Sequence, residues 1–197
     1  EYEISIKNAR AVSDALSVNY HTYIIVIRGQ DWYWENNSGM AFAINKDDFS
    51  LKVDNEKIRF DAVFIAIHGK PGENGLLQGY LEMLKIPFTS CDTFCSALTF
   101  NKNACKVFLE AWGIELAPSV IINTEDHYSA ASILQKTGLP CFVKPNASGS
   151  SFGVSKVINE DDLEDAIAEI GGEDVQVSGL GIGQELRVGQ GLGAADV

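Results

Sequence analysis

A loop of small residues beside a lysine is the part of this sequence whose residue types best suit chemistry. Residues 146–151 read Asn-Ala-Ser-Gly-Ser-Ser, and Lys144 stands just before them. Glycine allows backbone conformations that are closed to other residues, and successive main-chain N–H groups in such a turn can wrap an anion. Lys144 would add a full positive charge. The stretch suggests a phosphate-binding flap, although a plain hairpin with a surface lysine fits the same residues equally well.

This candidate flap differs from a Walker-type phosphate loop. A Walker loop ends in Gly-Lys-Ser or Gly-Lys-Thr and runs into a helix. Neither ending occurs here, and residues 152–157, which follow the loop, are predicted to form a strand. If phosphate binds at this position, a flap between two strands closes over it.

A second loop with chemically useful side chains follows an apolar segment that ends at residue 67. Residues 68–75 read HGKPGENG and contain His68 and Glu73. A strand, a glycine-rich loop and a helix in this order place binding sites at the carboxyl ends of strands in open α/β sheets. We therefore expect His68 and Glu73 to face a crevice. The alternative is a tight turn in which Glu73 interacts with the positive end of the next helix.

The elements that must position these loops alternate between helix and strand. Helices are expected at 1–16, 76–85, 91–98, 101–112, 124–136 and 161–170, and strands at 20–27, 57–67, 86–90, 119–122, 141–144, 152–157 and 174–177. Residues 32–39 are expected to form a small hairpin or loop. The nearly continuous apolar run that ends at residue 67 is typical of a parallel sheet buried on both faces. The sequence thus predicts an α/β protein with a lobe boundary near 98–101.

Composition narrows the class of protein. The 197 residues are 46% hydrophobic, which is enough for a real core, and the net charge of −12 argues against a nucleic-acid groove. No apolar run approaches the roughly 20 residues of a membrane span, and no signal peptide opens the chain. We expect a soluble, cytoplasmic protein. The four cysteines form no CxxC pair and are interpreted as buried free thiols.

Several segments resemble one family, and they occur in the same order as in that family. Residues 68–82 resemble its HGxxGEDGxxQGxLE stretch, residues 101–106 its DKxxxK segment and residues 142–157 its VKPxxxGSSxGxxKV loop. The family is the D-alanine:D-alanine ligases, which are ATP-grasp enzymes. Residues 1–5 are similar to its SExEVS segment, and residues 175–189 to its VxVExxIxGxELxVG segment. Together these segments span nearly the whole chain.

The resemblance implies a fold in two lobes. Residues 1–98 would form the N-terminal substrate-binding lobe, a parallel-sheet or pre-ATP-grasp lobe. Residues 99–197 would form the small lobe of the ATP-grasp fold and the start of the C-terminal lobe. The remainder of that lobe is absent from this sequence.

The resemblance also implies a reaction. ATP phosphorylates the carboxylate of one D-alanine, and the amine of a second D-alanine attacks the acyl phosphate. The resulting dipeptide serves peptidoglycan synthesis, and through it cell-wall biogenesis and cell shape. Phosphoryl transfer of this kind needs positive charge aimed at oxygen atoms more than a covalent nucleophile from the protein.

Roles for individual residues follow by similarity to the family. The implied ATP contacts are Lys102, Lys144, Gly149, Ser150, Ser151 and Glu185, the last of which would take the ribose hydroxyls. The implied contacts to the first D-alanine are Glu1, which would hold its ammonium group, and His68, which would lie near the reacting carboxylate. Glu73 would orient His68, and Ser150 would hydrogen-bond to Glu1. Glu1, His68 and Ser150 are thus the expected catalytic set.

The chain departs from the family pattern in three places. Ser178 stands where the family usually has a glutamate facing the adenine amino group, which puts adenine recognition in doubt. The first strand with its GGxS turn is missing, as is the C-terminal lobe that carries the Mg²⁺ ligands. We expect ATP and Mg²⁺ as cofactors, with no metal ligands in this chain. We therefore expect these 197 residues to be part of a full ligase and to be inactive alone.

Two other functions fit the same residues. One is a different ATP-grasp amide or ester ligase, such as a D-alanine:D-lactate ligase. The other is a non-catalytic nucleotide-binding module that kept the flap but not the metal site. The expected partners are the small molecules D-alanine and ATP, with no nucleic acid and no membrane. The family is often dimeric, which makes a homodimer the candidate assembly.

Overall fold

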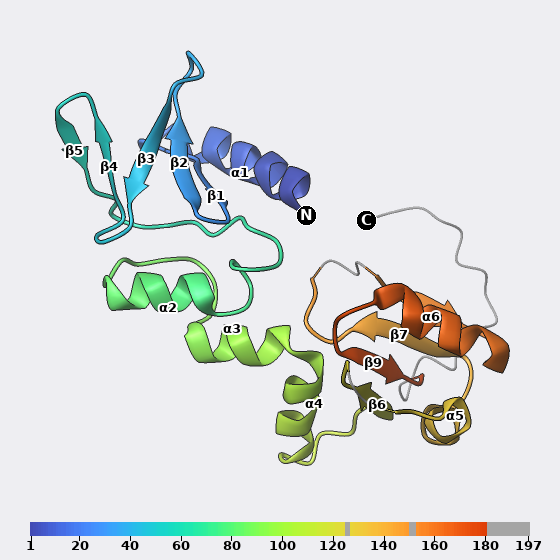
Figure 1. Cartoon of the computed structure of the whole chain (residues 1–197). Coiled ribbons are helices and arrows are strands. Elements are labelled where there is room, and N and C mark those ends of the chain that lie inside the picture. Colours follow the sequence, from blue (N-terminus) through green and yellow to red (C-terminus); the bar gives the residue numbers. More distant parts are fainter. Residues whose placement is uncertain (125–126, 150–152, 181–197) are drawn as a thin grey trace. The chain divides into compact units, whose positions relative to one another are not determined.

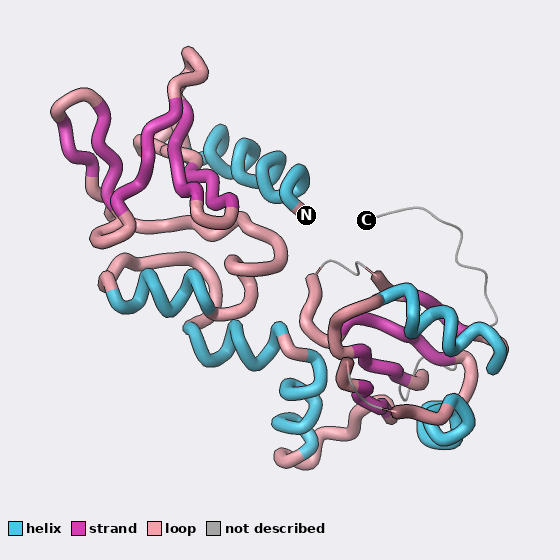
Figure 2. The backbone as a smooth tube through the Cα atoms, in the orientation of Figure 1, coloured by secondary structure: helices cyan, strands magenta, loops and turns pink. Residues whose placement is uncertain are grey.

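The computed structural model describes residues 1–124, 127–149 and 153–180, so the predicted site residues Ser150, Ser151 and Glu185 lie outside the described residues. The chain divides into two compact units, Glu1–Ala97 and Leu98–Val197. Both units contain helices and strands (Figures 1 and 2), which confirms the mixed α/β class predicted from the sequence.

The first unit is built around an antiparallel sheet. In chain order the elements up to the unit boundary are α1 (Tyr2–Leu16), β1 (Ile25–Arg28), β2 (Asp31–Glu35), β3 (Ala41–Asn45), β4 (Ser50–Val53), β5 (Glu56–Ile58), α2 (Leu76–Met83) and the start of α3 (Thr93–Phe100). The strands lie in the order β1-β2-β3-β4-β5, and each pairs antiparallel with the next.

The core of this unit joins the sheet to α2. Ile44, Phe49 and Leu51 are buried with Leu77 and Leu81 of α2, and none of the five is more than 5% exposed. Aromatic rings extend this core, because the ring of Tyr80 meets those of Trp32 and Phe49 edge to face. The small hairpin or loop predicted at 32–39 is a hairpin formed by β2 and its turn into β3, and Trp32 and Trp34 pack against other aromatic rings.

The prediction of a parallel sheet is wrong for this unit, because β1–β5 all pair antiparallel. Short turns such as Asn36–Gly39 connect neighbouring strands, whereas parallel strands need a crossover of a dozen or more residues. The apolar run up to residue 67 instead lies in the long loop between β5 and α2 (Figure 2). Its described parallel pairing is a single bridge between Val63 and Phe88, closed by hydrogen bonds of Val63 N–H to Pro87 O and Thr89 N–H to Val63 O.

The second unit begins within α3 and contains a smaller sheet covered by helices. Its further described elements are α4 (Lys102–Glu110), β6 (Ser119–Ile122), α5 (Ala130–Thr137), β7 (Cys141–Pro145), β8 (Ser155–Val157), a 3-10 turn (Glu160–Asp162), α6 (Leu163–Ile170) and β9 (Val175–Ser178). The strand order is β6-β9-β7-β8, and all three pairings are antiparallel. The predicted strand pair on either side of the small-residue loop is confirmed as β7 and β8.

Alternation along β7 decides which side chains reach the core of the second unit. Cys141 and Val143 are fully buried, and they pack with Val175 and Val177 of β9 against Leu163 and other residues of α5 and α6. Successive side chains of a strand point to opposite faces. Phe142 and Lys144 therefore point away from the helices.

Two smaller expectations need correction. The helix predicted at 124–136 begins only at Ala130, because Ser129 rather than Thr124 supplies the N-cap and accepts a hydrogen bond from Ser132 N–H. The cysteines are free as predicted, but Cys141 is the buried one and Cys91 is exposed. Among the described residues, no helix is both long enough and apolar enough to cross a membrane.

Candidate active site

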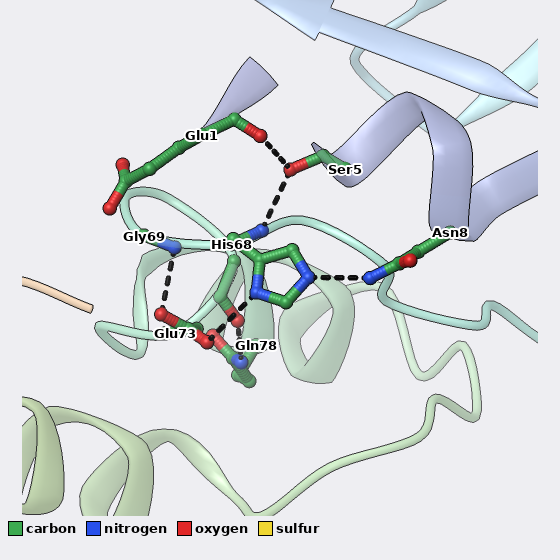
Figure 3. Close-up of polar contacts among 8 residues, drawn as sticks. Glu1, Ser5, Asn8, His68, Gly69, Glu73 and Gln78 are labelled. Atoms are coloured by element: carbon green, nitrogen blue, oxygen red, sulfur yellow. Dashed lines mark hydrogen bonds and ion pairs between the residues drawn. The ribbon is translucent and has the colours of Figure 1, made fainter. Parts of the chain in front are cut away.

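The first cluster of predicted site residues lies where α1 meets the loop before α2. Glu1, Ser5 and Asn8 stand at the start of α1 with spacings of four and three residues, which places them on one face of the helix. His68, Gly69 and Glu73 lie on the loop opposite that face (Figure 3). The structure thus brings Glu1, His68 and Glu73 together, although the sequence separates Glu1 from His68 by most of the first unit.

Ser5 connects the helix to the loop. Its hydroxyl accepts a hydrogen bond from the main-chain N–H of His68 at 3.0 Å and donates one to the main-chain oxygen of Glu1 at 3.0 Å (Figure 3). Ser5 is only 9% exposed. A buried hydroxyl that satisfies both groups fixes the backbone of His68 relative to the first turn of α1.

Polar groups lie on both sides of the imidazole of His68. Its Nε2 lies 2.7 Å from Nδ2 of Asn8, and its Nδ1 lies 3.9 Å from Oε1 of Glu73 (Figure 3). The other carboxylate oxygen of Glu73 accepts a hydrogen bond of 2.7 Å from Gly69 N–H. Glu73 is therefore engaged with the loop, while the N-cap residue of α2 is Gly75 and the helix has no side-chain cap. The short contact of Glu73 closes the turn that begins at Gly69, and the imidazole lies beyond hydrogen-bond distance of the carboxylate.

Gly69 leaves space for the carboxylate of Glu1. A Cβ atom added at Gly69 would collide with Oε2 of Glu1, and the backbone there has a φ of +75°. Both facts favour glycine, because a side chain would collide with the carboxylate and would strain the backbone. The carboxylate of Glu1 therefore rests directly over the loop that carries His68 (Figure 3).

Gln78 supports this loop from below, and the sequence analysis missed it. Gln78 is 1% exposed, and its Nε2 donates hydrogen bonds to Gly72 O at 2.6 Å and Ser90 Oγ at 3.2 Å. Among the described residues its Oε1 has no partner. A polar residue on the inner face of the amphipathic α2 was the available signal, since such a residue is buried only when it has hydrogen bonds to make.

The second cluster lies in the second unit and contains the two predicted phosphate-binding lysines. The ammonium of Lys102, at the first position of α4, donates a hydrogen bond of 2.8 Å to Ser148 O in the small-residue loop. Burial lowers the pKa of Lys102 below its usual value, and the positive charge of Lys144 lowers it further. Burial also lowers the pKa of Lys144. The negative charge of Glu173 opposes this lowering of the Lys102 pKa.

Asn146, which was not singled out from the sequence, ties α4 to the end of β7. Its Oδ1 accepts a hydrogen bond of 2.9 Å from Asn103 N–H, and its Nδ2 donates one of 3.1 Å to Asn101 Oδ1. Its main-chain oxygen accepts the N–H of Lys102 at 3.0 Å. Asn146 is 5% exposed. This one residue therefore fixes the helix that carries Lys102 to the strand that carries Lys144.

The sheet face that carries Lys144 also bears buried polar groups without described partners. Gln176 lies opposite Lys144 in the β7–β9 register, and Ser178 follows on the same face of β9. Nε2 of Gln176 and Oγ of Ser178 are buried and form no hydrogen bond to a described residue. Buried polar groups usually have partners. Gln176 and Ser178 are therefore candidate contacts for a polar ligand.

The other predicted ATP contacts lie only partly within the described residues. Gly149 is the last described residue of the flap, while Ser150, Ser151 and Glu185 lie outside the described residues. Among residues 1–124, 127–149 and 153–180, no group of three or more His, Cys, Asp or Glu side chains gathers in a way that could hold a metal ion.

Comparisons with known proteins agree on one family. A model of the D-ala D-ala ligase N-terminus matches residues 1–91, and a model of the D-ala D-ala ligase C-terminus matches residues 108–188. The D-alanine–D-alanine ligase of Flavobacterium johnsoniae is 44% identical over 178 residues, which are 90% of this chain and 55% of that protein. The ligase of Phocaeicola vulgatus is 41% identical over 168 residues, which are 85% of this chain and 52% of that protein.

Solved structures give the same result. D-alanyl-alanine synthetase A from Vibrio cholerae superposes with a TM-score of 0.77 at 29% identity, over 90% of this chain and 55% of that one. VanG D-Ala:D-Ser ligase from Enterococcus faecalis superposes with a TM-score of 0.73 at 27% identity, over 91% of this chain and 60% of that one.

The chain spans about half the length of the curated relatives it matches. Its fold accordingly corresponds to part of the ATP-grasp fold. The two family models together match most of the sequence, at its beginning and toward its end. This chain belongs to the D-alanine–D-alanine ligase family.

Proposed function

We propose that the complete protein is an ATP-dependent ligase that joins two D-alanines for peptidoglycan synthesis. The observation that carries this proposal is the hydrogen bond of Lys102 to Ser148 O in the small-residue loop, with Asn146 holding the start of α4 to the end of the strand that carries Lys144. Two partly buried cations without a described carboxylate within ion-pair distance suit an anionic ligand. A triphosphate is such a ligand.

In the proposed reaction a carboxylate oxygen of the first D-alanine bonds to the γ-phosphorus of ATP as the bond to ADP breaks. The amine of the second D-alanine then attacks the carbonyl carbon, phosphate leaves, and the nitrogen loses a proton. Lys102 and Lys144 stabilise the negative charge on the phosphate oxygens during the first step. The backbone of Gly149, Ser150 and Ser151 is proposed to bind the same phosphates, as the family resemblance implies.

The first unit provides the groups proposed to hold the first D-alanine. The carboxylate of Glu1 lies over Gly69, where it can accept hydrogen bonds from the ammonium group of the amino acid. His68 is held on the same loop and is proposed to contact the reacting carboxylate. Glu73 orients the imidazole. Ser150 is proposed to hydrogen-bond to Glu1 when the site is complete.

The adenosine part of ATP is proposed to bind along the Lys144 face of the second sheet. Ser178 offers a hydroxyl where the family usually has a glutamate, and Gln176 offers an amide beside it. Glu185 is proposed to hold the ribose hydroxyls. We infer that the ligands of Mg²⁺ lie outside the described residues.

The proposed substrates also suggest where the protein works. ATP and D-alanine are small molecules of the cytoplasm, so we infer a cytoplasmic location. A homodimer is the proposed assembly, because the family is often dimeric. Nucleic acid is not a proposed partner, because the net charge of −12 would repel its phosphates. The dipeptide product would support cell-wall biogenesis and cell shape.

Product analysis tests this function directly. We expect the complete protein to release phosphate from ATP only when D-alanine is present, and to form D-alanyl-D-alanine in preference to products with D-lactate or D-serine. Phosphate release that is independent of D-alanine would contradict the proposal. Preference for D-lactate would support the ester-forming ligase, and ATP binding without turnover would support the non-catalytic nucleotide-binding module.

Two matched variants distinguish a specific contact between Glu1 and the ammonium group from a general effect of negative charge on α1. Glu1→Gln should raise the KM for the first D-alanine about tenfold or more, because a charge-assisted hydrogen bond contributes about 1.5–3 kcal/mol. Glu3→Gln removes the same charge from an exposed position two residues away on α1 and should leave the KM unchanged. Equal effects of the two variants would argue against a specific contact with the ammonium group.

A further inference from the structure

We propose that Asn8 is a positioning residue that holds His68 in the neutral tautomer with its proton on Nδ1. The consequence for ligation rests on the proposed function, whereas the tautomer itself can be measured without it. Asn8 belongs to none of the sequence motifs that identified the family.

The contact between Asn8 and His68 is short and directional. Nδ2 of Asn8 lies 2.7 Å from Nε2 of His68, and in Figure 3 the amide points at the edge of the ring. Asn8 stands one helical turn after Ser5, whose hydroxyl holds the main chain of the same histidine. Helix α1 therefore contacts His68 at two points, one on its backbone and one on its ring.

The chemistry of the amide selects the tautomer. The Nδ2 group of asparagine only donates hydrogen bonds, so the nitrogen that faces it must accept one. Nε2 of His68 is then unprotonated, and the proton of the neutral ring lies on Nδ1. That nitrogen faces the carboxylate of Glu73, 3.9 Å away. The donor of Asn8 beside Nε2 and the carboxylate of Glu73 on the side of Nδ1 therefore favour the same tautomer.

The surroundings of Asn8 make it a clean position for substitution. Asn8 is exposed at the surface of α1, so replacing it should leave no cavity in the core. Asn8→Ala removes the donor. Asn8→Asp keeps the size of the side chain but reverses the polarity of the contact, because an ionised carboxylate only accepts hydrogen bonds. Lys7→Ala on the same helix turn serves as the control, since Lys7 is exposed and is not among the described contacts of His68.

Nitrogen-15 NMR of the histidine rings tests the proposal on the complete protein. The chain has three histidines, and a His68→Gln variant assigns the signal of interest. In the unsubstituted protein at neutral to mildly alkaline pH, we expect Nδ1 protonated and Nε2 unprotonated. Asn8→Ala should give a mixture of tautomers, Asn8→Asp should place a proton on Nε2, and Lys7→Ala should change nothing. A protonated Nε2 in the unsubstituted protein, or signals that ignore both Asn8 substitutions, would overturn the proposal.

Ligation kinetics provide the second measurement. Asn8→Ala should lower kcat/KM for D-alanine about 3- to 10-fold, which is the range expected for one lost hydrogen bond, and Asn8→Asp should lower it further. Neither variant should change the affinity for an ATP analogue. A change in tautomer without any change in kinetics would overturn the positioning role while leaving the ligase function intact. If no ligation occurs with any variant, the proposed function fails, and the NMR result still decides the tautomer.

Discussion

Gly69 shows how a single missing side chain can place a functional group. The carboxylate of Glu1 occupies the space that a Cβ atom would fill, and the loop carries His68 one residue earlier. The sequence motif predicted His68 and Glu73 as neighbours because they are close in the chain. It could not show that Glu1 lies over Gly69, because that contact joins two segments about 68 residues apart.

We predict that Gly69→Ala weakens binding of the first D-alanine about tenfold or more, because the new methyl group displaces the carboxylate of Glu1. The variant also has a cost of about 1–2 kcal/mol for a non-glycine residue at positive φ. Gly39→Ala is the control, since Gly39 has a φ of +81° with no atom within 4 Å of the added Cβ. Steady-state KM and urea unfolding of both variants check the prediction. Similar changes in KM for the two would contradict it.

A pH dependence follows from the two lysines. Burial lowers the pKa of both Lys102 and Lys144 below 10.5, so the folded protein binds fewer protons than the unfolded chain in the alkaline range just below that value. The stability contributed by these groups therefore rises with pH across that window. Binding of a phosphate needs the charged forms, so affinity for an ATP analogue should fall as pH rises through the same window.

The measurement is calorimetric titration from about pH 7 to about pH 10, since the charge on an ordinary lysine is retained over most of that range. Lys102→Arg provides the control, because a guanidinium remains charged and its affinity should depend less on pH. An affinity for the analogue that stays constant to about pH 10 in the unsubstituted protein would contradict the assignment of these lysines as phosphate ligands.

At the scale of elements, the junction between α4 and β7 depends on Asn146. Its side chain satisfies one N–H at the start of α4 and one oxygen of Asn101, and both groups would lose a partner in Asn146→Ala. We predict a loss of about 1–3 kcal/mol in the free energy of unfolding and weaker binding of an ATP analogue, because Lys102 is no longer held beside the flap.

Denaturant unfolding and analogue titration measure both effects. Asn159→Ala is a suitable control, because the side chain of Asn159 bonds only to the exposed Asp162 among the described residues, and its loss should cost less than about 0.5 kcal/mol. Equal stability of Asn146→Ala and the control would show that the junction does not depend on Asn146.

Local patterns predicted some elements better than others. The strands around the flap and the helices at α1, α2, α4 and α6 follow apolar periodicity and nearby glycines, and the structure confirms them. Strand direction was not predictable, because an apolar run indicates burial but not its partner. The helix predicted at 124–136 was placed too early, because its N-cap residue is Ser129. Gln78 and Asn146 escaped notice because their hydrogen bonds are tertiary.

At the scale of the whole molecule, the chain consists of two compact units with different chemistry. The first presents a carboxylate and an oriented histidine, and the second presents two partly buried lysines beside a flap. The family resemblance predicted from the sequence is confirmed by the matched family models and the solved structures. Composition alone could not have predicted these two clusters, because it carries no information on which residues lie together within each unit.

Titration of the complete protein with a non-hydrolysable ATP analogue tests the central claim most directly. We predict that Lys144→Ala and Lys102→Ala each weaken binding about tenfold or more, because each removes a charge-assisted contact to phosphate. Lys136→Ala removes the same charge from the exposed end of α5 and should leave the affinity within about twofold, since exposed charges are well screened. Unchanged affinity in Lys144→Ala, or equal losses in all three variants, would contradict the account.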